Sequence, residues 1–356
     1  MRSIGTLSHE NQARKLIAFL KRQKIDASCE MAFDPATAQM SYTIWVHDED
    51  QIPKAQELFA EFLKNSEAVQ YETPIETEPT QEIPIKRASY FFTTFMIALC
   101  VFVFLINLPE RTALIKEEGL VDAQFSMTQV EETLLIDIPQ PLVDLDQLFL
   151  NSPASPSQQE VEQIMQEPFW RGAYSWLLNA FQGKDPASGE GPFLQKVREG
   201  EVWRLFTPCL LHRDLLHILF NMIWVWILGR PIEHCIGMKR TLALTLATGI
   251  GSNLAQYLMS GALFLGYSGV VTGLAGFIWM REKIAPWEGY PVHRATLLFL
   301  AFFVGIFFLL QLGSFLLQIF TPVQFEAGIA NTAHIAGAMI GIMLGKWSFF
   351  KRQSLV

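Results

Sequence analysis

Charged residues and cysteines are scarce in this chain of 356 residues. Only 17% of the residues are Asp, Glu, Lys or Arg, below the ~25% usual in soluble domains. The four cysteines form no Cys-x-x-Cys pair, which disfavours a disulfide framework and a metal site. Lys and Arg total 27 against 35 Asp and Glu, so we expect no nucleic-acid partner. Residues 1–24 lack the apolar core of a signal peptide.

Apolar residues make up half of the chain and gather in long runs. Residues 88–108 hold 21 positions without a charge, enough at 1.5 Å per residue to cross a ~30 Å hydrocarbon core. Three later stretches also lack Asp, Glu, Lys and Arg: 241–280, 295–325 and 327–345. Together with glycine-rich breaks, these runs predict six membrane helices at about 88–108, 214–229, 241–260, 268–282, 295–313 and 332–348.

The first 65 residues have a soluble pattern instead. Apolar residues at helical spacing follow Ser8, a candidate N-cap, and a second helix is expected near Pro53–Leu63. Two strands, Ala27–Phe33 and Met40–His47, are expected between them. We therefore expect an all-α polytopic membrane protein with a small α+β N-terminal domain. The expected boundaries are a domain at 1–65, a Glu- and Pro-rich linker at 66–87, a membrane domain at 88–348 with a long external loop at 109–213, and a tail at 349–356.

Basic residues predict how the chain lies across the membrane. Lys and Arg precede the first predicted helix, join the second to the third and the fourth to the fifth, and follow the sixth, while the connections 261–267 and 314–331 contain none. Because cytoplasmic loops carry the excess of Lys and Arg, we expect both termini in the cytoplasm. Residues 109–201 carry 16 acidic and 6 basic residues, a net charge of −10, and are expected outside.

Four polar residues fall where apolar ones are expected: His217, Asn221, Ser268 and His334. Ionisable groups within a membrane are costly and are functional candidates. His217, Ser268 and His334 each lie 12 or 13 residues before the basic residue that ends their helix, which places all three at one depth, roughly 18–20 Å above the inner boundary. Asn221 follows His217 by one turn on the same face.

A serine becomes a strong nucleophile when a histidine takes its proton. No Asp or Glu shares this depth, so the pattern indicates a Ser268–His334 dyad, with His217 and Asn221 as oxyanion donors. Each residue alone is more commonly a packing or interhelical contact. Glycine stripes on the fourth and sixth helices predict the close approach that would join the dyad: Gly269, Gly273 and Gly276, and Gly337, Gly341 and Gly345.

At these residues the sequence resembles the rhomboid family of intramembrane serine proteases. The matching elements are Gly266-Tyr267-Ser268-Gly269 (GxSG), Ala333-His334-Ile335-Ala336-Gly337 followed by Gly341 (AHxxGxxxG), His217 to Asn221 (HxxxN) and Trp203-Arg204 (WR). The resemblance makes Ser268 the nucleophile and His334 the base. It assigns His217 and Asn221 to the oxyanion hole.

The resemblance implies a six-transmembrane-helix rhomboid fold that cleaves transmembrane proteins near their outer ends without a cofactor. Transmembrane substrates and membrane lipids are the expected partners, and a bacterial cytoplasmic (inner) membrane is the expected location. The oligomeric state stays open. Thr272 stands where an aromatic often stacks on the histidine in bacterial members, and its hydroxyl is expected either to bond back to its own helix or to contact His334. Residues 109–167 resemble an insertion, and Pro168–Leu178 an amphipathic interfacial segment.

Two other functions compete with proteolysis. A non-catalytic rhomboid-like protein would bind membrane clients, but a pure binder needs neither Ser268 nor His334. A small-solute transporter would be expected to show inverted repeats, and the sequence contains no evident internal repeat.

Overall fold

The computed structural model describes residues 2–34, 39–64, 66, 90–122, 126–151, 156–183, 191–321 and 330–352. The chain folds into two compact units, Met1–Lys86 and Arg87–Val356, each with its own hydrophobic core. Apart from Ser66, the predicted linker at 66–87 lies outside the described residues, as does the tail beyond Arg352.

The N-terminal unit contains a three-stranded antiparallel sheet and two helices. The strands are β1 (Arg2–Leu7), β2 (Ala27–Asp34) and β3 (Gln39–Val46), in the order β1-β3-β2. Helices α1 (Glu10–Arg22) and α2 (Ile52–Lys64) bury apolar faces against the core of this unit. The predicted α+β character is confirmed.

Two details of the N-terminal prediction were wrong. Strand β1 was not expected, because its sequence shows no alternation of apolar and polar residues; only Leu7 of the strand is buried, and its register with β3 shifts between Ser3 and Gly5. Ser8 is not the N-cap of α1. His9 occupies that position, with an extended backbone, and makes no side-chain capping bond.

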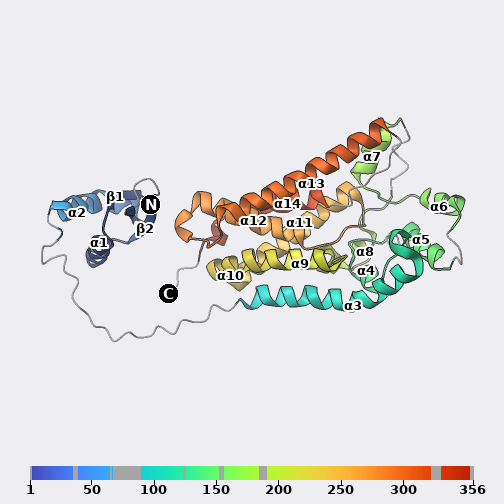
Figure 1. The fold of residues 1–356 in the computed structure, drawn as a ribbon, viewed down its shortest axis with the longest axis horizontal. Coiled ribbons are helices and arrows are strands. Elements are labelled where there is room, and N and C mark those ends of the chain that lie inside the picture. Colours follow the sequence, from blue (N-terminus) through green and yellow to red (C-terminus); the bar gives the residue numbers. More distant parts are fainter. Residues whose placement is uncertain are drawn as a thin grey trace. The chain divides into compact units, whose positions relative to one another are not determined.

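The second unit is a helical bundle, and a helix covers each of the six predicted segments (Figure 1). These helices are α3 (Phe91–Asp122), α9 (Leu215–Trp224) continued through a π-helical turn (Val225–Gly229) into α10 (Arg230–Ile236), α11 (Met238–Ser260), α12 (Ser268–Ile284), α13 (Arg294–Phe320) and α14 (Asn331–Lys346). Three spans are long and apolar enough to cross a membrane by themselves: Phe91–Lys116, Leu215–Ile236 and Arg294–Phe320. The other helices are shorter or more polar.

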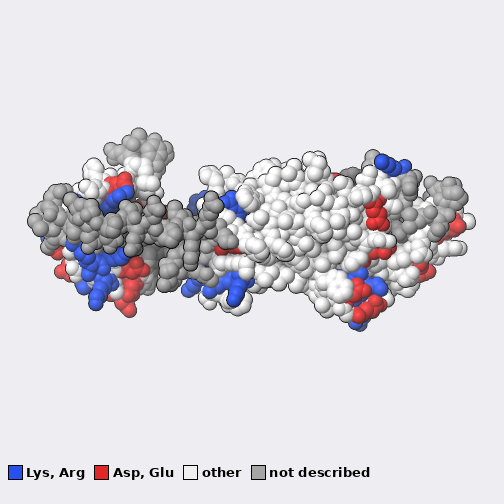
Figure 2. Space-filling model, turned by 90° about the horizontal axis from the view of Figure 1, so that it is seen from below, with Lys and Arg blue, Asp and Glu red and all other residues white. Residues whose placement is uncertain are grey.

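Charge separates along this unit (Figure 2). On the face shown, the middle of the unit lacks Lys, Arg, Asp and Glu, while Lys and Arg gather at one end, and Asp and Glu gather with some basic residues at the other. This pattern is typical of a protein that crosses a bilayer.

The region predicted as an external loop contains ordered short helices. They are α4 (Gln129–Leu134), α5 (Gln140–Asn151), α6 (Gln158–Met165), α7 (Ala173–Phe181), α8 (Gln195–Arg198) and two 3-10 helices, η4 (Val202–Leu205) and η5 (Thr207–Leu210). Helix α3 also runs 14 residues past its predicted end at Leu108, to Asp122. Asn107 and Arg111 of that helix contact the buried carboxylate of Glu131 in α4. These contacts hold the part of α3 beyond Leu108 against the loop.

Candidate active site

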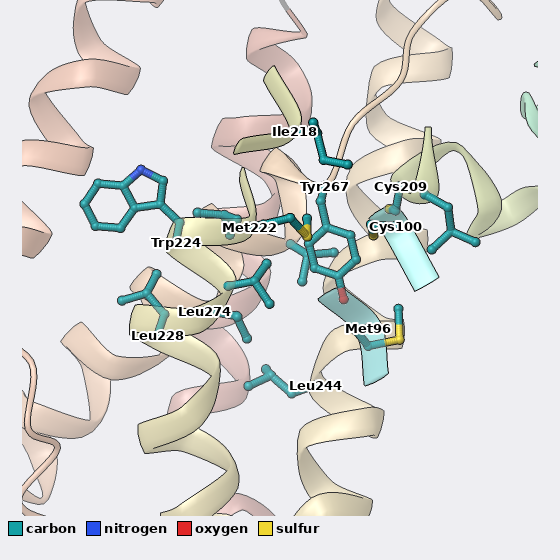
Figure 3. Packing of buried hydrophobic residues seen from close by; sticks show 14 of the residues in the cluster. Met96, Cys100, Cys209, Ile218, Met222, Trp224, Leu228, Leu244, Tyr267 and Leu274 are labelled. Atoms are coloured by element: carbon teal, nitrogen blue, oxygen red, sulfur yellow. The ribbon is translucent and has the colours of Figure 1, made fainter. Parts of the chain in front are cut away.

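Ser268 is the first residue of α12, directly after a buried turn. Gly266 has a φ of +124°, which favours glycine, and its N–H donates to the carbonyl oxygen of Pro208 at 3.0 Å. The next side chain, Tyr267, is 1% exposed and points into the apolar core between Met222 and Met96 (Figure 3). The turn and this anchor fix where the Ser268 hydroxyl lies.

His334 comes from the first turn of α14 and meets Ser268. The distance between His334 Nε2 and Ser268 Oγ is 2.8 Å, the separation expected of a base and its nucleophile. The imidazole is 8% exposed. Its Nδ1 is buried and has no hydrogen-bond partner among the described residues. The imidazole is therefore held by packing and by Ser268.

Small residues let α12 and α14 approach closely, as the glycine stripes predict. A methyl group on Gly337 would collide with the carbonyl oxygen of Gly269, and one on Gly341 with that of Gly273. On the other helix, a methyl group on Gly276 would meet the backbone of Ala338. The two backbones are thus nearly in contact, and this contact brings Ser268 and His334 together.

His217 and Asn221 lie on α9, beside the turn that precedes Ser268. Asp214 caps this helix by accepting from the N–H of His217 at 2.9 Å. A Cβ placed on Gly266 would lie 2.8 Å from His217 Nε2, so the imidazole faces the turn directly. Asn221 is buried and donates one amide hydrogen to the carbonyl oxygen of His217 at 3.0 Å. An amide has a second hydrogen to donate.

Thr272 follows Ser268 by one turn, and its hydroxyl bonds back to its own helix. The Thr272 hydroxyl donates to the carbonyl oxygen of Gly269 at 3.0 Å. Of the two alternatives that the sequence left open, back-bonding is therefore confirmed. The side chain is 7% exposed and lies against the position where Gly337 lacks a Cβ.

Sequence reasoning missed Gln256, which holds the start of α14 from α11. Ala330, the N-cap of α14, makes no side-chain capping bond. Instead, Gln256 Oε1 accepts from the N–H of Ala333 at 2.9 Å, one residue before His334. This acceptor satisfies a helix-terminal N–H that water would otherwise have to reach. Gln256 could have been found by searching the uncharged stretch 241–280 for amides as well as ionisable groups.

A second missed residue, His212, packs beside His217. The two rings meet edge to face with centroids 5.1 Å apart. His212 lies before the membrane span, and burial lowers its pKa to about 3, so its ring is neutral at pH 7. A neutral ring adds no positive charge beside His217.

The external loop is fastened to the end of α11, just before the turn that leads to Ser268. Tyr257 donates its phenolic hydrogen to the buried carboxylate of Asp137 at 2.9 Å, and the same carboxylate accepts from the N–H groups of Gln195 and Lys196. Trp170 donates its indole N–H to the carbonyl oxygen of Tyr257 at 2.9 Å. The segment that resembled an insertion thus helps to fix this end of the bundle.

The WR element contributes a further clamp. Arg204 is 5% exposed and donates to the carbonyl oxygens of Glu132 and Leu135 at 2.6 and 2.8 Å. Trp203, in contrast, is exposed. The arginine therefore holds the loop, while the tryptophan faces outward.

Comparisons with known proteins point to one family. Residues 199–351 match the family model described as rhomboid domain, and residues 1–74 match the cytoplasmic N-terminal domain of rhomboid serine protease. A rhomboid protease GlpG from Pectobacterium atrosepticum is 33% identical over 194 residues, 54% of this chain and 59% of the relative. Relatives of the same name from Yersinia pestis and Yersinia pseudotuberculosis are 36% identical over 149 residues, 41% of this chain and 48% of theirs. The matches thus span between about half and three fifths of these relatives.

Proposed function

We propose that this chain, which belongs to the rhomboid family, is a serine endopeptidase that hydrolyses peptide bonds in or near the transmembrane segments of other membrane proteins. The observation that carries the proposal is the 2.8 Å separation of Ser268 Oγ and His334 Nε2, deep in a helical bundle. Both groups lie on helices whose glycines press them together. A protein that only binds membrane clients would have no use for this pair.

In the proposed mechanism, His334 Nε2 takes the hydroxyl proton as Ser268 Oγ attacks the carbonyl carbon of the substrate. The new C–O bond leaves a negative charge on the carbonyl oxygen. His334 then passes its proton to the departing amine, which leaves an acyl-enzyme. A water molecule, deprotonated by His334, releases the acid and restores Ser268.

The oxyanion needs hydrogen-bond donors aimed at the position where the charge develops. We assign this role to His217 and Asn221, supported by the position of His217 Nε2 beside Gly266 and by the second amide hydrogen of Asn221. The N–H of Ser268 is a third candidate donor, because it lies at the start of α12, where the first backbone N–H groups have no partner within the helix.

No carboxylate is assigned to the site. His334 Nδ1 must carry a hydrogen when Nε2 accepts the serine proton, and no hydrogen-bond partner of Nδ1 occurs among the described residues. The site is therefore proposed to work as a dyad, with the imidazole oriented by the packing of α14 and the capping contact of Gln256 at Ala333.

The chain is a multi-pass membrane protein with a cytoplasmic N-terminal domain. We place it further in the cytoplasmic (inner) membrane of a bacterium, with both termini in the cytoplasm, supported by the basic end of the membrane unit (Figure 2). Transmembrane proteins are its proposed substrates. The proposed domain boundaries remain 1–65, a linker at 66–87 and 88–348, followed by a short tail.

The test is Ser268→Ala in purified protein reconstituted with a model transmembrane substrate. Cleavage should fall to background, because the proposed acyl-enzyme forms on the Ser268 hydroxyl that contacts His334. The thermal midpoint should barely change, since losing one hydroxyl leaves little cavity. The matched control is Ser252→Ala, which removes another buried hydroxyl, one that bonds back to Gly249 in α11. Cleavage by the Ser268→Ala protein at the rate of the control would overturn the proposal.

A further inference from the structure

Arg230 has an unusual environment at the junction of the π-helical turn and α10. Its guanidinium carbon lies 4.3 Å from the ring centroid of Tyr90 and 4.2 Å from that of Trp226. Two aromatic faces therefore enclose one cation. Such contacts stabilise the charge through the ring quadrupoles, but they leave the N–H groups at the edge of the guanidinium without acceptors.

No acceptor for these N–H groups occurs in the part of the chain that the structure describes. Arg230 Nε is buried without a hydrogen-bond partner. The nearest acid along the helix, Glu233, is fully engaged: its carboxylate accepts from the N–H groups of Phe92 and Thr93 and from the Thr93 hydroxyl. Three other arginines in this unit do pair with carboxylates: Arg111 with Glu131, Arg204 with Glu201 and Arg281 with Glu288.

The position of Arg230 in the membrane span indicates which class of hydrogen-bond acceptor it meets. It lies in the second half of the Leu215–Ile236 span, toward the end of the bundle where Lys239 and Arg240 follow in the sequence. Two more cation–aromatic contacts involve residues that flank the membrane helices, Lys283 over Trp279 and Arg240 over Phe349. Aromatic and basic side chains are enriched where lipid headgroups meet protein.

Apolar side chains continue outward from the end of α9 and from the π-helical turn that follows it. Trp226, Ile223 and Ile227 are 45%, 46% and 38% exposed. Trp226 contacts Arg230 directly, and all three side chains belong to the two turns that precede Arg230. A lipid could lay its acyl chains along these residues with its phosphate at the guanidinium edge, whereas a soluble anion would gain nothing from them.

We propose that Arg230, enclosed by Tyr90 and Trp226, binds the phosphate group of an anionic phospholipid. Because Nε is buried, the two terminal nitrogens of the guanidinium would make the pair of parallel N–H···O bonds with phosphate oxygens. Tyr90 precedes α3 and Trp226 belongs to the turn after α9, so a bound lipid would bridge two membrane helices. The site is separate from Ser268 and His334 and does not depend on the proposed proteolysis.

The experiment measures lipid binding to the full-length protein in detergent. Native mass spectrometry counts retained phosphatidylglycerol, and a titration with a short-chain phosphatidylglycerol follows the thermal midpoint. Phosphatidylcholine of the same chain length and soluble glycerol phosphate are run in parallel. The wild type should retain phosphatidylglycerol, and its midpoint should rise with that lipid more than with either comparison compound.

Arg230→Gln should weaken the apparent affinity for phosphatidylglycerol by about tenfold. Arg230→Lys should fall between the two, because it keeps the charge without the planar fork. The matched control is Arg240→Gln, which removes a basic residue that already donates to the carbonyl oxygen of Lys351 and should retain the lipid. Because mass spectrometry counts lipid on folded protein only, a loss of stability in a variant does not mask the result.

Three outcomes would overturn the proposal. In the first, Arg230→Gln retains as much phosphatidylglycerol as the wild type. In the second, Arg240→Gln loses as much as Arg230→Gln, which would indicate unspecific attraction to the basic end. In the third, glycerol phosphate alone reproduces the shift in midpoint, which would make the ligand a soluble anion.

Discussion

Each unit of this molecule contains a serine hydroxyl 2.8 Å from a histidine Nε2. In the membrane unit the pair is Ser268 and His334. In the N-terminal unit it is Ser28 and His47, and there the histidine Nδ1 also lies 3.0 Å from a carboxylate oxygen of Asp26. By distances alone, the N-terminal trio is the more complete, because it has the third member of a catalytic triad.

The surroundings reverse that ranking. The Asp26 side chain is 79% exposed and that of His47 36%, so water competes for every hydrogen bond in the trio. His334 is 8% exposed. Ser268 opens a helix beside His217, whereas Ser28 lies within strand β2. A short Ser–His contact therefore does not by itself identify a nucleophile. In the proposed function, Ser268 differs from Ser28 by its enclosed site and by the proposed oxyanion donors beside it.

The largest expected effect comes from the base. His334→Ala should lower cleavage by about 10⁴-fold or more, because among the described residues His334 is the base that is hydrogen-bonded to Ser268 Oγ. The double variant with Ser268→Ala should be no worse than either single variant, since the two residues act as one unit. Turnover numbers on a transmembrane substrate give the answer. Losses that add in the double variant would make His334 a structural residue, and the comparison with His47 would lose its basis.

Asn221→Ala should have a smaller effect, on the order of 10²-fold in turnover, because other donors to the oxyanion remain. The Michaelis constant should change little, since the missing hydrogen bond forms mainly in the transition state. Kinetics at several substrate concentrations separate the two constants. An unchanged turnover number would leave Asn221 with only its contact to the His217 carbonyl oxygen, and the enclosed site would have one donor fewer than proposed.

The bundle was predictable because its signals are local and strong. Long uncharged runs give the helices, and the glycine stripes give the contact of α12 with α14. The shared depth of Ser268 and His334 predicted their approach. The number of residues from the basic end of each helix, multiplied by the rise per residue, gives the depth of each side chain along the membrane normal.

The external loop was not predictable in the same way. Its helices are short, and contacts far apart in sequence hold them: Asp137 with Tyr257 is separated by 120 residues, and Arg204 with Leu135 by 69. The spacing of apolar residues along the sequence does not predict such long-range hydrogen bonds. Gln256 was missed for a related reason, since the importance of its amide follows only from the position of Ala333 on another helix.

Thr272→Val should lower turnover less than tenfold, since it keeps the branched shape and removes only the hydroxyl. That hydroxyl donates to the carbonyl oxygen of Gly269, and His334 Nδ1 has no hydrogen-bond partner among the described residues, so the hydroxyl does not orient His334. Turnover should therefore fall less than tenfold, below ~1.4 kcal/mol of barrier. A hundredfold loss with an unchanged thermal midpoint would show that the hydroxyl acts on the base during the reaction.

The smallest expected effect is that of Ser28→Ala, which should leave cleavage unchanged. A sharper form of this test uses Ser268→Ala protein treated with a fluorophosphonate, a reagent that labels activated serines. In this background Ser28 is the serine with a histidine partner and a carboxylate in the geometry of a triad. We expect no label, because His47 and Asp26 are open to water, which competes for their hydrogen bonds and leaves the half-buried Ser28 hydroxyl weakly activated. Peptide mapping by mass spectrometry identifies any labelled residue. Label on Ser28 that disappears in the Ser28→Ala, Ser268→Ala double variant would show that the hydrogen-bonded trio suffices for activation, and enclosure would then no longer explain the difference between the two pairs.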